Sequence, residues 1–169
     1  MSLILLADDS PHAQRMGQSI LAGEGFAVEC VGNGDDAGLR FREVDPDVVI
    51  VDAHLPGLNG IDLCRDVKSR CRHVRVILTV GSLEDLDEPA AHRAGCDAVL
   101  RKPFEASQML AAVRPLALEA QRARKNSEAA TGVFDPAAHV REAVERAVER
   151  ELPRFLEEVT QKVLAALGH

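Results

Sequence analysis

Groups that could do chemistry together lie at the ends of four short apolar runs, although they are far apart in the sequence. They are Asp8-Asp9, Asp52, Thr79 and Lys102. Carboxylates that gather at one place repel one another, so such a site either raises a carboxyl pKa or holds a cation. Oxygen ligands favour a hard ion such as Mg²⁺, and a lysine is a point charge suited to a phosphate. These are the parts needed to form and hold an aspartyl phosphate at Asp52.

The apolar runs themselves predict five strands. The run Val48–Val51 is continuously apolar rather than alternating, which is typical of a strand buried on both faces of a sheet. The predicted strands are Leu3–Ala7, Ala27–Val31, Val48–Val51, Val74–Val80 and Ala98–Leu100.

Segments of helical pattern fill the intervals between the strands. Ser10-Pro11 predicts an N-cap followed by proline at the first helical position, and this helix should stop near Gly23. Pro89 predicts that one later helix is short or frayed at its start, and Pro115 predicts a kink or an end in the last one. The later helices are expected at Asp35–Val44, Ile61–Arg70, Leu83–Ala94 and after Phe104.

The alternation of strands and helices predicts an α/β fold, with a parallel sheet covered by helices on both faces. Such sheets place their ligand sites at the carboxyl ends of the strands. That rule selects the same acidic, hydroxyl and basic residues, because each follows or ends a strand. The sequence therefore predicts that they meet at one edge of the sheet.

From Ile4 to Phe104 the sequence resembles a response-regulator receiver domain of bacterial two-component signalling. The resemblance rests on an ordered set of motifs at strand ends: the acidic pair Asp8-Asp9, the loop Asp52-Ala-His-Leu-Pro-Gly-Leu-Asn-Gly60, the hydroxyl of Thr79 and the segment Lys102-Pro103-Phe104. It implies a flavodoxin-like (βα)5 sandwich, in which a parallel five-stranded sheet has the order 2-1-3-4-5. A C-terminal helical extension would follow this sandwich.

The resemblance also implies a function. Asp52 would accept a phosphoryl group from a histidine kinase or phosphotransfer protein, helped by Lys102 and Thr79. Asp9 and Asp52 would bind Mg²⁺ directly, Asp8 would bind it through water, and the backbone carbonyl of Ala53 would complete the site. The protein would be a phosphoacceptor switch with self-catalysed phosphotransfer and slow autodephosphorylation, and not an enzyme in the usual sense.

Four positions depart from the family's pattern or vary within it. Val99 stands where the family usually has an aromatic residue that turns inward on activation, and Val80 is bulkier than the small residue usual after the switch hydroxyl. These two changes should spare the acceptor chemistry but weaken the coupling of Thr79 to the output face. His54 and Gly81 occupy variable positions that tune the phosphate lifetime in this family.

Composition bounds the partners and the compartment. The net charge is −7, and residues 1–104 hold 11 basic and 17 acidic residues, so no basic excess favours nucleic-acid binding. The apolar run near the start, Leu3–Ala7, is too short for a signal peptide or a membrane span, and acidic residues follow it directly. Four cysteines without CxxC pairing indicate reduced, mostly buried thiols. We therefore expect a cytoplasmic protein with no nucleic-acid partner.

Other interpretations compete with the phosphoacceptor site. Taken singly, Asp8 could be a helix cap, Asp52 a turn residue, Thr79 a β-former and Lys102 a solvated charge. An aspartyl-phosphate phosphatase of the haloacid-dehalogenase type would want Asp-x-Asp after the first strand, whereas here the two aspartates are adjacent. The segment Gly32–Ala37 fits a dinucleotide fingerprint, but two acidic residues would face the pyrophosphate, so we assign it to a tight turn.

The C-terminal part of the chain predicts a separate segment. We divide the chain into a receiver domain at 1–118, a linker at 119–135 and an amphipathic helical segment at 136–169. In the segment 136–169, apolar residues recur every four positions and form a stripe that must be buried against another surface. The segment would pack back on the receiver, or associate with copies of itself or a helical partner. The stretch Glu151–Val159 is weakly similar to the C-terminal oligomerisation helix of bacterial polar-organising proteins, and no DNA-binding or catalytic output domain fits there.

Two functional readings follow. In the first, the protein is a response regulator that acts through protein–protein contacts. In the second, it is a degenerate receiver that serves as an assembly module, and its phosphorylation is incidental.

Overall fold

A computed structural model describes residues 1–131 and 162–163, with side chains described up to Ser127 and at 162–163. It contains one parallel sheet whose strand order is β2-β1-β3-β4-β5, as the resemblance implied. The strands are β1 (Leu3–Ala7), β2 (Ala27–Val31), β3 (Val48–Asp52), β4 (Arg75–Gly81) and β5 (Ala98–Lys102). The first two coincide with the predicted strands, and β3 and β5 run on to include the acidic and basic residues that were predicted to follow them.

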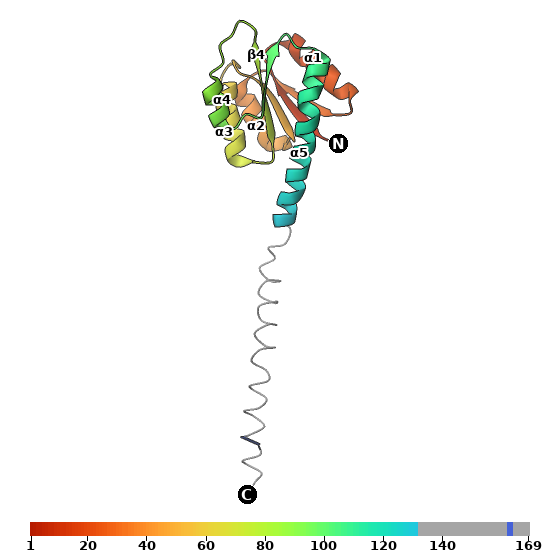
Figure 1. Cartoon of the computed structure of the whole chain (residues 1–169), viewed down its shortest axis with the longest axis vertical. Helices are drawn as coiled ribbons and strands as arrows, with labels where there is room; N and C mark the ends of the chain where they lie inside the picture. Colours follow the sequence, from red (N-terminus) through yellow and green to blue (C-terminus); the bar gives the residue numbers. More distant parts are fainter. Residues whose placement is uncertain (132–161, 164–169) are drawn as a thin grey trace. The chain divides into compact units, whose positions relative to one another are not determined.

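Among the described residues, five helices cover the two faces of the sheet (Figure 1). They are α1 (Pro11–Gly23), α2 (Gly34–Val44), α3 (Gly60–Arg70), α4 (Glu88–Ala94) and α5 (Ala106–Thr131). One core cluster joins the sheet to α2, α3 and α4 through residues such as Phe41, Leu63 and Ala91. The other joins it to α1 and α5 through Leu21, Met109 and Val113. The fold is therefore the three-layer, flavodoxin-like sandwich.

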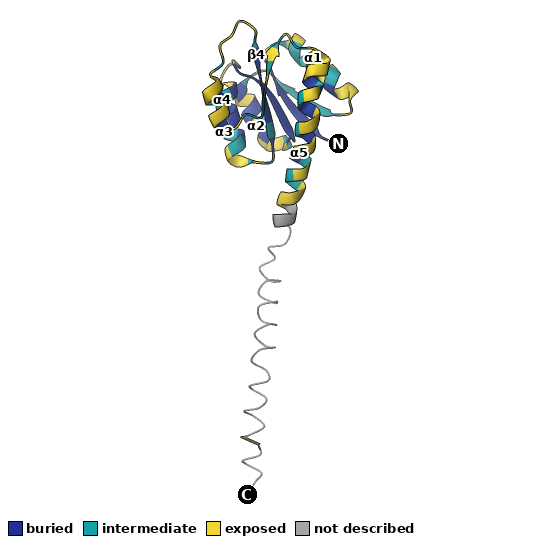
Figure 2. Cartoon of the chain, in the orientation of Figure 1, coloured by how far each residue is buried: buried dark blue, intermediate teal, exposed yellow. Residues whose placement is uncertain are grey.

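The sheet carries most of the core. All five residues of β3 are buried, as its continuous apolar run predicted. Figure 2 shows the buried strands at the centre of the sandwich, with the exposed residues on the outer faces of the helices. All four cysteines are free thiols, but only Cys64 is fully buried, where burial raises its pKa to about 12.

Polar side chains start the first four helices. The side chains of Ser10, Asn33, Asn59 and Asp87 each accept a hydrogen bond from a backbone N–H in the first turn of the helix that follows. Pro89 lies in the first turn of α4, which explains why this helix begins at Glu88 and not near Leu83.

The last helix differs from the sequence prediction. Pro115 was expected to kink or end it. The helix does not end there, because α5 continues from Ala106 to Thr131, and the predicted kink stays a prediction. Proline has no backbone N–H, so one hydrogen bond of the helix is missing at Pro115 and leaves a gap in its hydrogen-bond pattern. Buried Val113, Ala117 and Ala120 hold the helix against the domain on both sides of this gap.

The chain divides into two compact units, Met1–Asn126 and Ser127–His169. The first holds the whole sheet and most of α5. Apart from residues 162–163, the predicted amphipathic segment at 136–169 lies outside the described residues, as does part of the predicted linker at 119–135. The boundaries predicted from the sequence stay predictions.

Candidate functional site

The predicted site residues do converge at the carboxyl edge of the sheet. Asp8 and Asp9 follow β1, while Asp52 and Lys102 are the last residues of β3 and β5. Thr79 lies two residues before the end of β4, where it is in register with Asp52. Parallel pairing places these strand ends side by side, so residues up to 94 positions apart in the chain become neighbours.

Lys102 joins the two buried carboxylates of the site. Its Nζ atom lies 2.7 Å from Oδ2 of Asp8 and 2.5 Å from Oδ2 of Asp52. The two aspartates are only 3% and 7% exposed. Burial by itself would lower the pKa of Lys102, but the hydrogen bonds and charges of Asp52 and Asp8 outweigh it and raise that pKa above its ordinary value. The ammonium group is therefore charged at neutral pH.

The backbone around Asp52 is fixed from both sides. Oδ1 of Asp52 accepts a hydrogen bond from the N–H of His54 at 2.8 Å, and the N–H of Ala53 donates to the carbonyl of Thr79 at 2.8 Å. The loop then folds back so closely that a Cβ atom on Gly60 would lie 2.5 Å from the carbonyl oxygen of Asp52. Glycine at position 60 is what lets α3 begin directly beneath the acidic residue.

The donor set of the site fits a hard divalent cation. Carboxylate oxygens of Asp8, Asp9 and Asp52 lie within 4.8 Å of one another, and Asp9 is the exposed member. The carbonyl of Ala53 accepts one hydrogen bond, from the N–H of Gly60 at 3.1 Å. A carbonyl oxygen has two lone pairs, so this one could also serve as a ligand. An oxygen-only group of this kind matches Mg²⁺.

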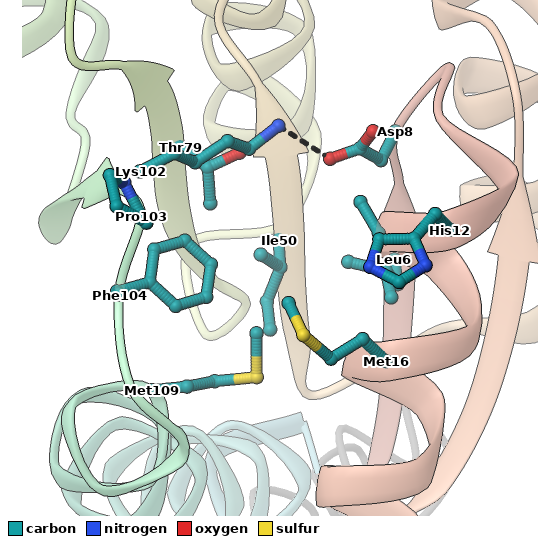
Figure 3. A pocket seen from close by; sticks show the side chains of 11 residues that line it. Leu6, Asp8, His12, Met16, Ile50, Thr79, Lys102, Pro103, Phe104 and Met109 are labelled. Atoms are coloured by element: carbon teal, nitrogen blue, oxygen red, sulfur yellow. Dashed lines mark hydrogen bonds and ion pairs between the residues drawn. The ribbon is translucent and has the colours of Figure 1, made fainter.

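An apolar pocket of about 290 Å³ opens beside the bridge between Asp8 and Lys102 (Figure 3). Its polar rim includes these two residues, Thr79 and His12. Its apolar wall combines side chains from the sheet, α1, the β5–α5 loop and α5, namely Leu6, Ile50, Met16, Phe104 and Met109. The buried part of the site therefore borders an apolar surface on the α1–α5 side.

Two residues near the site were not predicted from the sequence. Nε2 of Gln14, on α1, donates to the carbonyls of Asp8 and Val31 at 2.6 and 3.1 Å. Oε2 of Glu84 lies 3.3 Å from Nδ1 of His54 and accepts a hydrogen bond from the N–H of Gly81 at 2.7 Å. A polar residue on a helix or in a loop gives no sequence signal of such a contact.

His54 lies in the β3–α3 loop, half exposed and beside Glu84. Ligand atoms of Asp52, His54 and Glu84 also lie within 4.8 Å of one another. The contact between His54 and Glu84 thus joins the β3–α3 loop to the β4–α4 loop near Asp52.

The residues that depart from the family's pattern occupy different environments. Thr79 is 3% exposed and Val80 is fully buried, whereas Val99 on β5 is 40% exposed. The outward position of Val99 leaves an aliphatic group at the surface of the edge strand. The predicted weakening of the switch through Val99 stays a prediction.

The glycine-rich turn before α2 has a structural explanation. The N–H of Gly34 donates to the carbonyl of Pro56 at 2.9 Å, and a Cβ atom at Gly34 would lie 1.7 Å from the carbonyl oxygen of Leu58. Asn33 caps the helix. The glycine therefore permits close contact with the loop after Asp52, which supports the tight-turn interpretation over a dinucleotide site.

Comparison with known families agrees with this geometry. Residues 4–114 match the response regulator receiver domain. The chain belongs to the receiver domain family of response regulators. A receiver domain is normally a phosphoacceptor switch and not a classical enzyme, and it implies a histidine kinase partner.

Two relatives show how far the similarity extends. The chain is 35% identical over 111 residues to the DNA-binding response regulator MtrA of Mycolicibacterium smegmatis, covering 66% of this chain and 48% of that protein. It is 30% identical over 150 residues to the sensory transduction protein RegX3 of the same organism, covering 88% of this chain and 64% of that protein. The chain thus spans about half the length of the MtrA relatives that it matches.

Solved structures share the fold. A receiver domain protein from Clostridium thermocellum is 28% identical with a TM-score of 0.67, covering 72% of this chain and 98% of the other. A response regulator from Chloroflexus aurantiacus is 25% identical with a TM-score of 0.65, covering 69% of this chain and 98% of the other. The family match does not reach Glu151–Val159, so the similarity of that stretch to polar-organising proteins stays a prediction.

Among the residues that the structure describes, no helix has the length and apolar character needed to cross a membrane.

Proposed function

We propose that this receiver domain accepts a phosphoryl group on Asp52 from a histidine kinase or phosphotransfer protein, in a reaction that depends on Mg²⁺, and that it signals through protein–protein contacts in the cytoplasm. The observation that carries the proposal is the position of Lys102. Its ammonium group contacts the carboxylates of Asp52 and Asp8 at once. A cation held there can pair with an oxygen of a phosphoryl group that is transferred to Asp52.

The chemistry needs positioning and charge neutralisation more than covalent help from the protein. A carboxylate oxygen of Asp52 attacks the phosphorus atom, so an O–P bond forms while the P–N bond of the phosphohistidine breaks and its imidazole leaves. Lys102 then pairs with a phosphoryl oxygen, and the hydroxyl of Thr79 donates to another. Asp8, Asp9, Asp52 and the carbonyl of Ala53 would hold Mg²⁺, which supplies positive charge to the phosphoryl oxygens.

Small phosphodonors test the assignment without the kinase. Acetyl phosphate with Mg²⁺ should add one phosphoryl mass to the wild-type chain, read by intact mass spectrometry, and none to the Asp52→Asn variant. Chelation of the metal should abolish labelling, because the clustered carboxylates need the cation. Asp62→Asn is the matched control, since Asp62 is a partly exposed aspartate at the start of α3 that lies outside the carboxylate cluster, and this variant should be labelled like the wild type.

Labelling that persists in Asp52→Asn would show that another group accepts the phosphoryl. An unlabelled wild-type chain would favour the second reading, a degenerate receiver that acts as an assembly module. Steady-state hydrolysis of a generic phosphate ester would instead favour an aspartyl-phosphate phosphatase.

A further inference from the structure

Gln14 connects α1 to the two strand ends that carry the acidic pair. Its side-chain nitrogen donates to the carbonyl of Asp8 at 2.6 Å and to the carbonyl of Val31 at 3.1 Å. The N–H of Asp8 donates to the same carbonyl of Val31 at 3.1 Å. Gln14 therefore closes the gap between β1 and β2 just beyond the point where their regular pairing stops at Ala7 and Val31.

The other groups of Asp8 are already held. Oδ1 of Asp8 accepts a hydrogen bond from the N–H of Ser10 at 2.9 Å, and Oδ2 contacts Lys102 at 2.7 Å. With the bond from Gln14, its N–H, its carbonyl and both carboxylate oxygens have partners. The orientation of Asp8 is therefore set by four contacts, which come from β2, α1, β5 and the N-cap residue Ser10.

Asp9 has much less to hold it. It is exposed, and within the described residues no hydrogen bond or ion pair fixes its carboxylate. The carbonyl of Asp8 belongs to the peptide group that leads to Asp9, and that group is planar. A hydrogen bond that fixes this carbonyl also fixes the direction in which the chain enters Asp9.

We propose that Gln14 is a positioning residue for the metal-binding carboxylates, because it fixes the peptide between Asp8 and Asp9 and so sets the spacing of Asp9 from Asp8 and Asp52. The proposal rests on the function proposed above. An amide is suited to this task, since one nitrogen carries two hydrogens and can serve two carbonyls on neighbouring strands. Residues that orient metal ligands in this way contribute to affinity without touching the metal.

The decisive comparison uses Gln14→Met, which keeps the length of the side chain and removes both donors. The matched control is Gln18→Met, the same change at an exposed position one turn further along α1. Mg²⁺ affinity of the full chain is measured by NMR titration or calorimetry, with no phosphodonor present. We expect Gln14→Met to bind Mg²⁺ about 10-fold more weakly than the wild type, and Gln18→Met to match it.

A second measurement needs no variant. In the wild-type chain, the side-chain amide protons of Gln14 should exchange with solvent more slowly than those of Gln18, and their NMR signals should shift when Mg²⁺ is added.

Labelling from acetyl phosphate should be slower in Gln14→Met at low Mg²⁺ and should recover when Mg²⁺ saturates the site. A residue that only stabilised the fold would not make the labelling rate depend on the Mg²⁺ concentration in this way.

The outcomes separate this inference from the proposed function. Lower stability of Gln14→Met in urea with unchanged Mg²⁺ affinity would overturn the positioning role and leave the phosphoacceptor function standing. Fast exchange of the Gln14 amide protons would overturn it as well. A wild-type chain that binds Mg²⁺ but takes no label would remove the proposed function, while weaker binding in Gln14→Met would still support the positioning role. A wild-type chain that binds no Mg²⁺ would overturn both.

Discussion

The ammonium group of Lys102 lies between two buried carboxylates, so its removal leaves Asp8 and Asp52 facing each other without a cation. In the absence of metal we expect Lys102→Ala to lower the free energy of unfolding by about 1–3 kcal/mol, measured by urea denaturation. Added Mg²⁺ should restore part of this loss, because binding to the folded state stabilises it. Phosphoryl accumulation on Asp52 should be impaired, while Mg²⁺ binding should stay largely intact.

The pH dependence of that stability difference follows from the raised pKa of Lys102. A group whose pKa is raised in the folded state stabilises the protein fully below its ordinary pKa, which is 10.5 here, and this stabilisation is lost as the pH rises through the higher folded value. As far as Lys102 is concerned, the difference between wild type and variant should be constant from about pH 6 to 9 and should shrink only above the ordinary lysine pKa. Loss of Mg²⁺ binding in Lys102→Ala would contradict the role given to this lysine.

At the scale of residues, sequence reasoning could predict the acidic, hydroxyl and basic groups, because each lies at or near the end of an apolar strand. It could not predict Gln14 or Glu84. A glutamine in an amphipathic helix and a glutamate in a loop are ordinary surface residues until the fold shows what they contact. Their contacts join elements that the chain order does not place side by side.

At the scale of elements, α5 depends on an arginine contact near its C-terminal end. Arg124 bonds the carboxylate of Asp45, and its guanidinium donates to the carbonyl of Asp45 at 2.9 Å and lies 3.3 Å from Asp47. These partners belong to the loop between α2 and β3. Arg124→Ala should therefore lower the free energy of unfolding by about 1–3 kcal/mol in urea denaturation.

Arg122→Ala is the matched control for this prediction, since Arg122 is exposed on the same helix. Its effect should stay within about 0.5 kcal/mol, as is usual for surface substitutions. Equal stability of the two variants would mean that the contacts of Arg124 add nothing to the docking of α5. A loss confined to Arg124→Ala would place the end of the receiver beyond residue 118, the boundary predicted from the sequence.

The strands and most helix starts were predictable because strong local signals specify them: continuous apolar runs, capping side chains and a proline in the first turn. The start of α4 was not, because this helix begins at Glu88 and not near Leu83. The path of α5 through Pro115 was not, because packing of Val113, Ala117 and Ala120 outweighs the local preference of proline. The switch belongs to this scale too. With Val99 exposed on β5 in place of an aromatic, we expect a smaller rearrangement on phosphorylation than is usual in the family.

At the scale of the whole molecule, the question is how the apolar stripe of the C-terminal segment is covered. The sequence places apolar residues every four positions from Val140 to Leu152 and again from Phe155 to Leu167. Val163, a member of this stripe, is 49% exposed. Short helices are marginal in water and cannot bury such a stripe alone. We expect a second copy of the chain to cover it, with glutamate and arginine residues left at the rim.

Analytical ultracentrifugation of the full chain against a truncation that ends at Asn126 tests this prediction. The truncation keeps the first compact unit and the contacts of Arg124, so it should stay folded. The full chain should be oligomeric at tens of micromolar and the truncation monomeric, with labelling of Asp52 unchanged. A monomeric full chain would point instead to a stripe packed against the receiver or covered by a different helical partner. An oligomeric truncation would place self-association in the receiver itself.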